Sequence, residues 1–99
     1  MHTPMEIKID RIDNGSKGYF LATEGEKEAG RMTYTWAGEH KLIIDHTEVD
    51  PAFAGRSIGK KLLMELVHFV RENQVKVLPL CPFAKSVFAK MESIRDVLV

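Results

Sequence analysis

The chain has 99 residues, which predicts one domain over residues 1–99 because globular domains usually contain about 50–200 residues. Hydrophobic residues make up 44% of the sequence and charged residues 28%. This composition is typical of a folded protein and excludes a disordered or collagen-like chain. Fourteen basic residues balance fourteen acidic ones, so the net positive charge of a general nucleic-acid binder is missing and we expect no nucleic-acid partner.

The single cysteine, Cys81, excludes an intramolecular disulfide and a zinc site built on paired cysteines. The four histidines are scattered without metal-binding spacing, so no metal site is expected. Residues 1–6 lack the basic region and apolar run of a signal peptide. No apolar run approaches the roughly 20 residues that span a bilayer. These features predict a cytoplasmic protein with no membrane partner.

The first half of the chain shows the period-two alternation of apolar and polar residues that is typical of β-strands. The alternation predicts four strands, at 5–10, 19–23, 29–36 and 41–49, with the first beginning at Met5. In the fourth strand, the consecutive apolar residues 42–44 place apolar groups on both faces. This predicts a central strand that is covered on both sides.

The second half of the chain changes to a helical pattern after Asp50-Pro51. Between Gly55 and Asn73, apolar residues recur at the spacing of one face of an α-helix. A short apolar run over 75–80 predicts a buried strand, and Pro82 opens a second helix because its fixed φ suits the first helical position. The order of elements predicts an α/β fold with a mixed, mostly antiparallel sheet, a helix after the fourth strand and a second, C-terminal helix.

The most informative segment follows the fourth strand and reads Gly55-Arg56-Ser57-Ile58-Gly59-Lys60. The first N–H groups of a helix lack intrahelical partners and, with the helix dipole, form a site for an anion such as phosphate. The two glycines would let the backbone approach a ligand closely, Ser57 adds a hydroxyl donor, and Arg56 and Lys60 add positive charge. The segment is therefore either the start of a phosphate-binding helix or a helix with a glycine start and solvated lysines.

Two familiar phosphate motifs do not fit this segment. A P-loop needs four residues between its glycines, whereas three separate Gly55 from Gly59. The dinucleotide fingerprint Gly-x-Gly-x-x-Gly is also absent. The sequence therefore favours neither nucleotide hydrolysis nor hydride transfer.

The run from His46 to Leu62, with Leu80-Cys81-Pro82-Phe83 and Asp96-Val97-Leu98, resembles the GNAT superfamily of acetyl-CoA-dependent N-acetyltransferases, and within it a minimal single-domain branch. The resemblance implies acetyl-CoA or CoA as cofactor, with its pyrophosphate on backbone N–H groups of the loop and its pantetheine arm on the backbone near Val49. Ala54 stands where this family usually has a basic or amide residue, so Arg56 is expected to supply the lost charge. The implied cofactor-binding residues are Val49, Gly55, Arg56, Ser57, Ile58, Gly59 and Lys60.

Three residues are candidates for the chemistry. In the minimal branch the cysteine of the Leu-Cys-Pro-Phe segment lies near the CoA sulfur, which implies that Cys81 accepts the acyl group. The alternative is a small apolar residue packed at a strand end. Glu48 shares a face of the fourth strand with His46, and either deprotonates the acceptor amine or is an exposed charge paired with lysine. His46 is either the base that serves Cys81 or a hydrogen-bonded core histidine.

The sequence thus predicts acetyl-CoA binding and N-acetyl transfer to an amine acceptor. Larger GNAT enzymes insert two helices between their first two strands, whereas here only residues 10–16 lie there, too few for a stable helix. The open acceptor site that this implies favours a macromolecular amine. The alternative is a non-catalytic CoA-sensing or protein-interaction module, which Ala54 and the missing helices favour, whereas Cys81 and Glu48 favour an enzyme.

Overall fold

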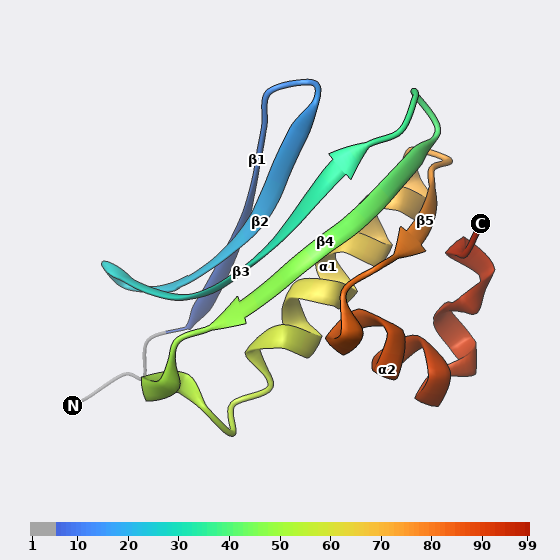
Figure 1. Cartoon of the computed structure of the whole chain (residues 1–99). Coiled ribbons are helices and arrows are strands. Elements are labelled where there is room, and N and C mark those ends of the chain that lie inside the picture. Colours follow the sequence, from blue (N-terminus) through green and yellow to red (C-terminus); the bar gives the residue numbers. More distant parts are fainter. Residues whose placement is uncertain (1–5) are drawn as a thin grey trace.

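The computed structural model describes residues 6–99, so Met5 of the expected first strand lies outside the described residues. Within this range, a five-stranded sheet in the order β1-β2-β3-β4-β5 packs against two α-helices and two short 3-10 helices (Figure 1). The elements are β1 (Ile7–Asp13), β2 (Lys17–Glu24), β3 (Lys27–Trp36), β4 (Lys41–Val49), η1 (Pro51–Phe53), α1 (Ile58–Glu72), β5 (Lys76–Pro79), α2 (Pro82–Lys90) and η2 (Glu92–Val97).

Strands β1 to β4 form an antiparallel meander, and β5 lies parallel to β4. Parallel neighbours need a long crossover, which α1 supplies. The register places Tyr34 opposite Ile44 and Trp36 opposite Leu42. These side chains lie on the face of the sheet that belongs to the hydrophobic core, and the residues between them point to the opposite face. The expected α/β fold, with a mixed and mostly antiparallel sheet, a helix after the fourth strand and a second helix near the C-terminus, is confirmed.

Helix α1 forms because its apolar residues recur at helical spacing and bury one stripe against the sheet. The buried side chains of this stripe are Ile58, Leu62, Leu63, Leu66, Val67 and Val70. Helix α2 begins at Pro82, as expected, and packs Ala84 and Phe88 into the same core. No helix within residues 6–99 is both long and apolar enough to cross a lipid bilayer.

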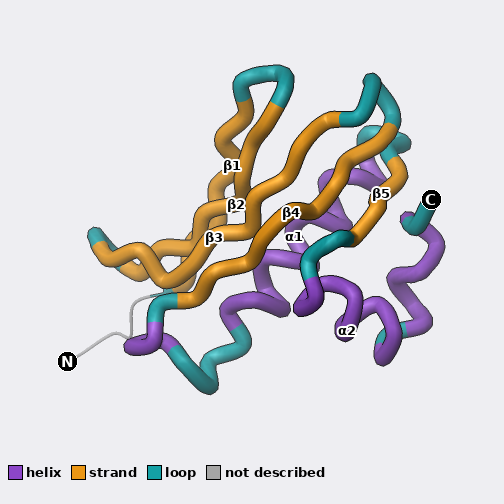
Figure 2. The backbone as a smooth tube through the Cα atoms, viewed as in Figure 1, coloured by secondary structure: helices purple, strands orange, loops and turns teal. Residues whose placement is uncertain are grey.

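Within the described residues, helices cover only one face of the sheet (Figure 2). Along β2 and β3, buried residues alternate with half-buried ones that face the other side. Ile43 is half-buried on this open face, between Thr35 and Leu78, and Leu78 is 39% exposed. The expectation of a fourth strand covered on both sides is therefore wrong, because Ile43 is sheltered by cross-strand neighbours rather than by a helix.

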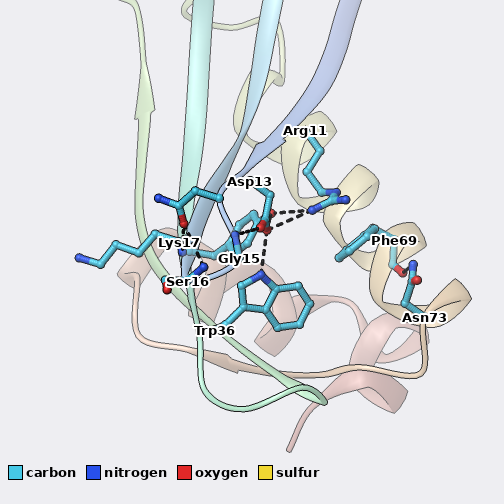
Figure 3. Close-up of polar contacts among 10 residues, drawn as sticks. Arg11, Asp13, Gly15, Ser16, Lys17, Trp36, Phe69 and Asn73 are labelled. Atoms are coloured by element: carbon cyan, nitrogen blue, oxygen red, sulfur yellow. Dashed lines mark hydrogen bonds and ion pairs between the residues drawn. The ribbon is translucent and has the colours of Figure 1, made fainter.

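The β1–β2 turn is tied to the sheet by the Asp13 carboxylate (Figure 3). It accepts hydrogen bonds from Tyr34 Oη at 2.6 Å, Trp36 Nε1 at 2.8 Å and the Gly15 N–H at 2.6 Å, and pairs with Arg11 at 3.1 Å. Partial burial acts to raise the pKa of Asp13, but these bonds and the Arg11 charge outweigh it and hold the pKa below its usual value. Burial and the bond to Asp13 raise the pKa of Tyr34 to about 12.

Candidate functional site

The cofactor site expected at the end of β4 coincides with a gap between β4 and β5. The two strands pair only along residues 41–44 and 76–79, and both Leu80 and Cys81 then donate their N–H groups to Ile44 O, at 3.0 and 3.1 Å. Beyond this point the two chain segments part (Figure 1). Within the described chain, residues 45–49 therefore have no strand partner on the β5 side. Unpaired backbone groups of this kind can bind an extended ligand that carries amides.

The start of α1 keeps its anion-binding groups free. The first helical backbone bond runs from Lys61 N to Ser57 O at 3.0 Å, and no described residue outside the helix accepts from the N–H groups of residues 57–60. Ser57 is the N-cap, with φ at +59°, and its hydroxyl makes no capping bond. Gly55 has φ at +81° and open space where a side chain would begin. This set of donors fits a phosphate group.

The Arg56 guanidinium is already paired within the structure. It forms an ion pair with Glu24, in which Nη1 lies 3.3 Å from Oε1, and its Cζ lies 5.1 Å from the centre of the Phe53 ring. The bond to Glu24 raises the pKa of Arg56, and the same bond lowers the pKa of Glu24. Arg56 is therefore engaged by β2 in this structure, and its expected role at the cofactor stays a prediction. Lys60 lies exposed on the first turn of α1.

Gly59 is covered by a side chain from α2. A Cβ built at Gly59 would lie 2.7 Å from Phe83 Cζ, so the missing side chain makes room for the Phe83 ring. This contact also places the start of α2 beside the start of α1. Ile58 is 1% exposed, which leaves only its backbone for a cofactor, and Val49 at the end of β4 is 38% exposed.

Cys81 is buried at the N-cap of α2. Its Sγ lies 3.2 Å from Thr47 Oγ1, close enough for a hydrogen bond in which either group is the donor. Thr47 pairs with Met32 and His46 with Thr33, so these two neighbours in β4 point to opposite faces of the sheet. The structure therefore does not bring His46 beside Cys81. Thr47 is the polar group that sequence reasoning missed, since no spacing in the sequence links it to Cys81.

His46 and Glu48 share the open face of β4, as expected, because they pair with Thr33 and Arg31 of β3. His46 lines a cleft of about 820 Å³ on this face, whereas Glu48 does not belong to its lining. Asp45 lines the same cleft. Sequence reasoning missed Asp45 because its orientation depends on an irregularity in strand pairing rather than on local pattern.

Comparison with known proteins identifies the family of the chain and supports its fold. The sequence profile of a family described as GCN5-related N-acetyl-transferase matches residues 18–97. A Staphylococcus aureus protein solved by NMR and described as GCN5-like is 32% identical, with a TM-score of 0.68 over 99% of this chain and 91% of that chain. Protein NATD1 of Xenopus tropicalis is 28% identical over 76 residues, which are 77% of this chain and 69% of that protein.

A more distant enzyme shares the fold alone. The ribosomal-protein-alanine N-acetyltransferase of Brucella melitensis is 16% identical, with a TM-score of 0.67 over 79% of this chain and 62% of that chain. The family match runs from β2 to η2 and so includes the gap between β4 and β5 and the start of α1. The chain therefore belongs to the GCN5-related N-acetyltransferase family.

Proposed function

We propose that the chain binds acetyl-CoA in the gap between β4 and β5 and transfers the acetyl group to an amine. The observation that carries this proposal is the parting of β4 and β5 after Ile44, which leaves residues 45–49, within the described chain, without a strand partner on the β5 side. Acetyltransferases of the family use acetyl-CoA, whose pantetheine arm carries two amides that such a strand edge can bind.

The residues that would hold the cofactor are those with free backbone donors. We assign the N–H groups of Gly55 and of residues 57–60 to the pyrophosphate. The Ser57 hydroxyl and the Lys60 ammonium group add a hydrogen bond and positive charge at the same end of α1. Val49 and the residues before it in β4 are assigned to the pantetheine arm.

Bound acetyl-CoA supplies a thioester, from which the amine nitrogen takes the acetyl carbon as the carbon–sulfur bond breaks, giving an amide and free CoA thiol. The chain's own part is to hold the amine and to remove the proton that its nitrogen loses. Glu48 and His46 are the proposed proton acceptors because both face the open side of β4. The sulfur that leaves is protonated from solvent or from either of these groups.

Direct attack by the amine is favoured over a route through an acylated Cys81. Catalytic thiols are often activated by an adjacent base, but the polar neighbour of Cys81 Sγ among the described residues is the hydroxyl of Thr47 at 3.2 Å. The sulfur is also buried, with Cys81 only 3% exposed. These two features favour a packing role for Cys81 at the N-terminus of α2.

A titration with CoA, followed through backbone amide NMR shifts, tests cofactor binding without knowledge of the acceptor. We expect CoA to shift the amides of Val49 and of residues 55–60. Pantetheine, which lacks the pyrophosphate, should shift Val49 but leave residues 55–60 unchanged. Unmoved amides at millimolar CoA would refute the proposed binding site.

Product formation then separates an enzyme from a binding module. Mass spectrometry of an amine panel incubated with acetyl-CoA should find an acetylated product, and Glu48→Gln should lower its rate. CoA binding with no product across peptides and small amines would instead identify a non-catalytic CoA-sensing module.

A further inference from the structure

Strand β4 carries a bulge at Asp45. Tyr34 pairs with Ile44 and the preceding residue of β3, Thr33, pairs with His46, so Asp45 is the extra residue. Two consecutive side chains, Asp45 and His46, therefore both line the open-face cleft.

The Asp45 carboxylate is held in place by β3. Thr35, which lies on the open face, donates its hydroxyl to Asp45 Oδ2 at 2.6 Å. Asp45 is the first residue after Ile44, the point where β4 and β5 part. The bulge thus fixes a carboxylate at the apex of the proposed cofactor gap, on the side that opens into the cleft.

Asp45 is also the carboxylate of this cleft whose charge is not already balanced. Among residues 6–99, no lysine, arginine or histidine nitrogen lies within 4.0 Å of it, and no donor reaches its Oδ1. Asp13, the other carboxylate in the lining, already pairs with Arg11 and accepts three hydrogen bonds. Lys17 is the cleft's ammonium group, and it too forms no ion pair with Asp45.

We propose that Asp45 is the residue of this cleft that selects the acceptor, because its carboxylate binds the ammonium group of a protonated alkylamine, for which a lysine side chain serves as the probe. Alkylamines are protonated at neutral pH and make strong, charge-assisted hydrogen bonds to carboxylates. The cleft also offers an apolar contact for the alkyl arm beside the end of β5, since Leu80 lines it and is 52% exposed. This inference rests on the proposed function and assigns Asp45 to acceptor binding, with proton removal left to Glu48 or His46.

A matched pair of probes tests this assignment in the absence of CoA. Nα-acetyl-lysine amide and Nα-acetyl-norleucine amide have similar arms, but only the first ends in an ammonium group. We expect the lysine probe to shift the amides of Thr33, Thr35, Asp45 and His46, with the norleucine probe binding about tenfold more weakly or not at all.

Asp45→Asn should remove this difference between the two probes while keeping the acceptor oxygen that Thr35 needs. Asp10→Asn is the matched control, because Asp10 is an exposed β1 carboxylate whose ion-pair partner, Lys8, lies 3.9 Å away. The inference would be overturned if the unchanged chain bound both probes equally or bound neither of them. It would also be overturned if a folded Asp45→Asn variant kept the same preference for the lysine probe. The probe comparison in the unchanged chain decides the matter even if Asp45→Asn does not fold.

This test is independent of the cofactor proposal. Failure of CoA to bind, with lysine binding intact, would overturn the proposed function but not the amine site. Normal CoA binding with no preference for the lysine probe would overturn the amine site alone.

Discussion

The Phe83 ring occupies the space that a side chain at Gly59 would need, with only 2.7 Å between Phe83 Cζ and a Cβ built at that glycine. This contact joins the first turns of α1 and α2, which flank the gap between β4 and β5. Phe83 is 37% exposed, so one side of the ring packs on α1 while part of the residue remains accessible to solvent. The glycine thus sets how closely the two helix starts approach each other.

Gly59→Ala should destabilise the protein by about 1 kcal/mol, because the new methyl group overpacks against Phe83. In the background of Phe83→Ala the same change should stabilise by about 0.5–1 kcal/mol, since alanine favours a helix more than glycine does. Urea denaturation of the four proteins measures both effects. The same sign of effect in both backgrounds would contradict the packing role of Gly59.

Asp13→Asn should destabilise the protein by about 1–3 kcal/mol, because the amide cannot accept all the hydrogen bonds that the carboxylate accepts from Tyr34, Trp36 and Gly15. Asp10→Asn, at an exposed site on the same strand, should change stability by no more than about 0.5 kcal/mol. Equilibrium unfolding in urea measures both. A comparable loss in the two variants would show that the Asp13 cluster does not anchor the β1–β2 turn.

Stability should fall as the pH rises from 10 to 12, because the pKa of Tyr34 is raised from 10.0 to about 12 by burial and by its bond to Asp13. The neutral phenol is favoured in the folded state, so its contribution is fully present below pH 10 and is lost as the pH rises through the folded pKa. Tyr34→Phe should be less stable at neutral pH but lose less stability over this alkaline range. Unfolding curves at closely spaced pH values give the two slopes, and equal slopes would be inconsistent with the raised pKa.

Local pattern in the sequence was sufficient to predict most of the fold. The period-two alternation located β2, β3 and β4, the helical spacing located α1, and Pro82 marked the start of α2. These signals are local because each reports which side of one element is buried. The groups that shield Ile43 from solvent could not be predicted in the same way. Its neighbours Thr35 and Leu78 belong to adjacent strands, and the local sequence around an apolar residue does not show whether such neighbours or a helix cover it.

The candidate site was harder to predict because its details depend on contacts between distant segments. The pairing of Arg56 with Glu24 joins residues 32 positions apart, and the contact of Cys81 with Thr47 joins residues 34 apart. The orientation of Asp45 depends on a bulge, which is set by the register between two strands and not by the residues of one strand.

Incubation with acetyl-CoA in the absence of an amine should leave Cys81 unmodified, because its sulfur is buried and its polar neighbour among residues 6–99 is the Thr47 hydroxyl rather than a base. Cys81→Ala should therefore retain both CoA binding and any transfer activity. Intact-protein mass spectrometry provides the measurement. An acetyl group on Cys81 that passes to an added amine would reverse this assignment and make Cys81 the nucleophile.

Lys60→Ala should weaken CoA binding more than Arg56→Ala, because the Arg56 guanidinium is held by Glu24 whereas Lys60 is exposed on the first turn of α1 and forms no ion pair with any residue of 6–99. An exposed charge contact with phosphate predicts a loss of up to about fivefold for Lys60→Ala and of less than about twofold for Arg56→Ala. Glu24→Gln supplies the decisive comparison, since it removes the charge that holds Arg56 and leaves the α1 backbone unchanged. Calorimetric titration at low ionic strength, where exposed charges are least screened, should find that Glu24→Gln binds CoA more tightly and that adding Arg56→Ala abolishes the gain. A loss for Arg56→Ala as large as that for Lys60→Ala would mean that Arg56 leaves Glu24 when CoA binds, and the charge missing at Ala54 would then come from Arg56 after all.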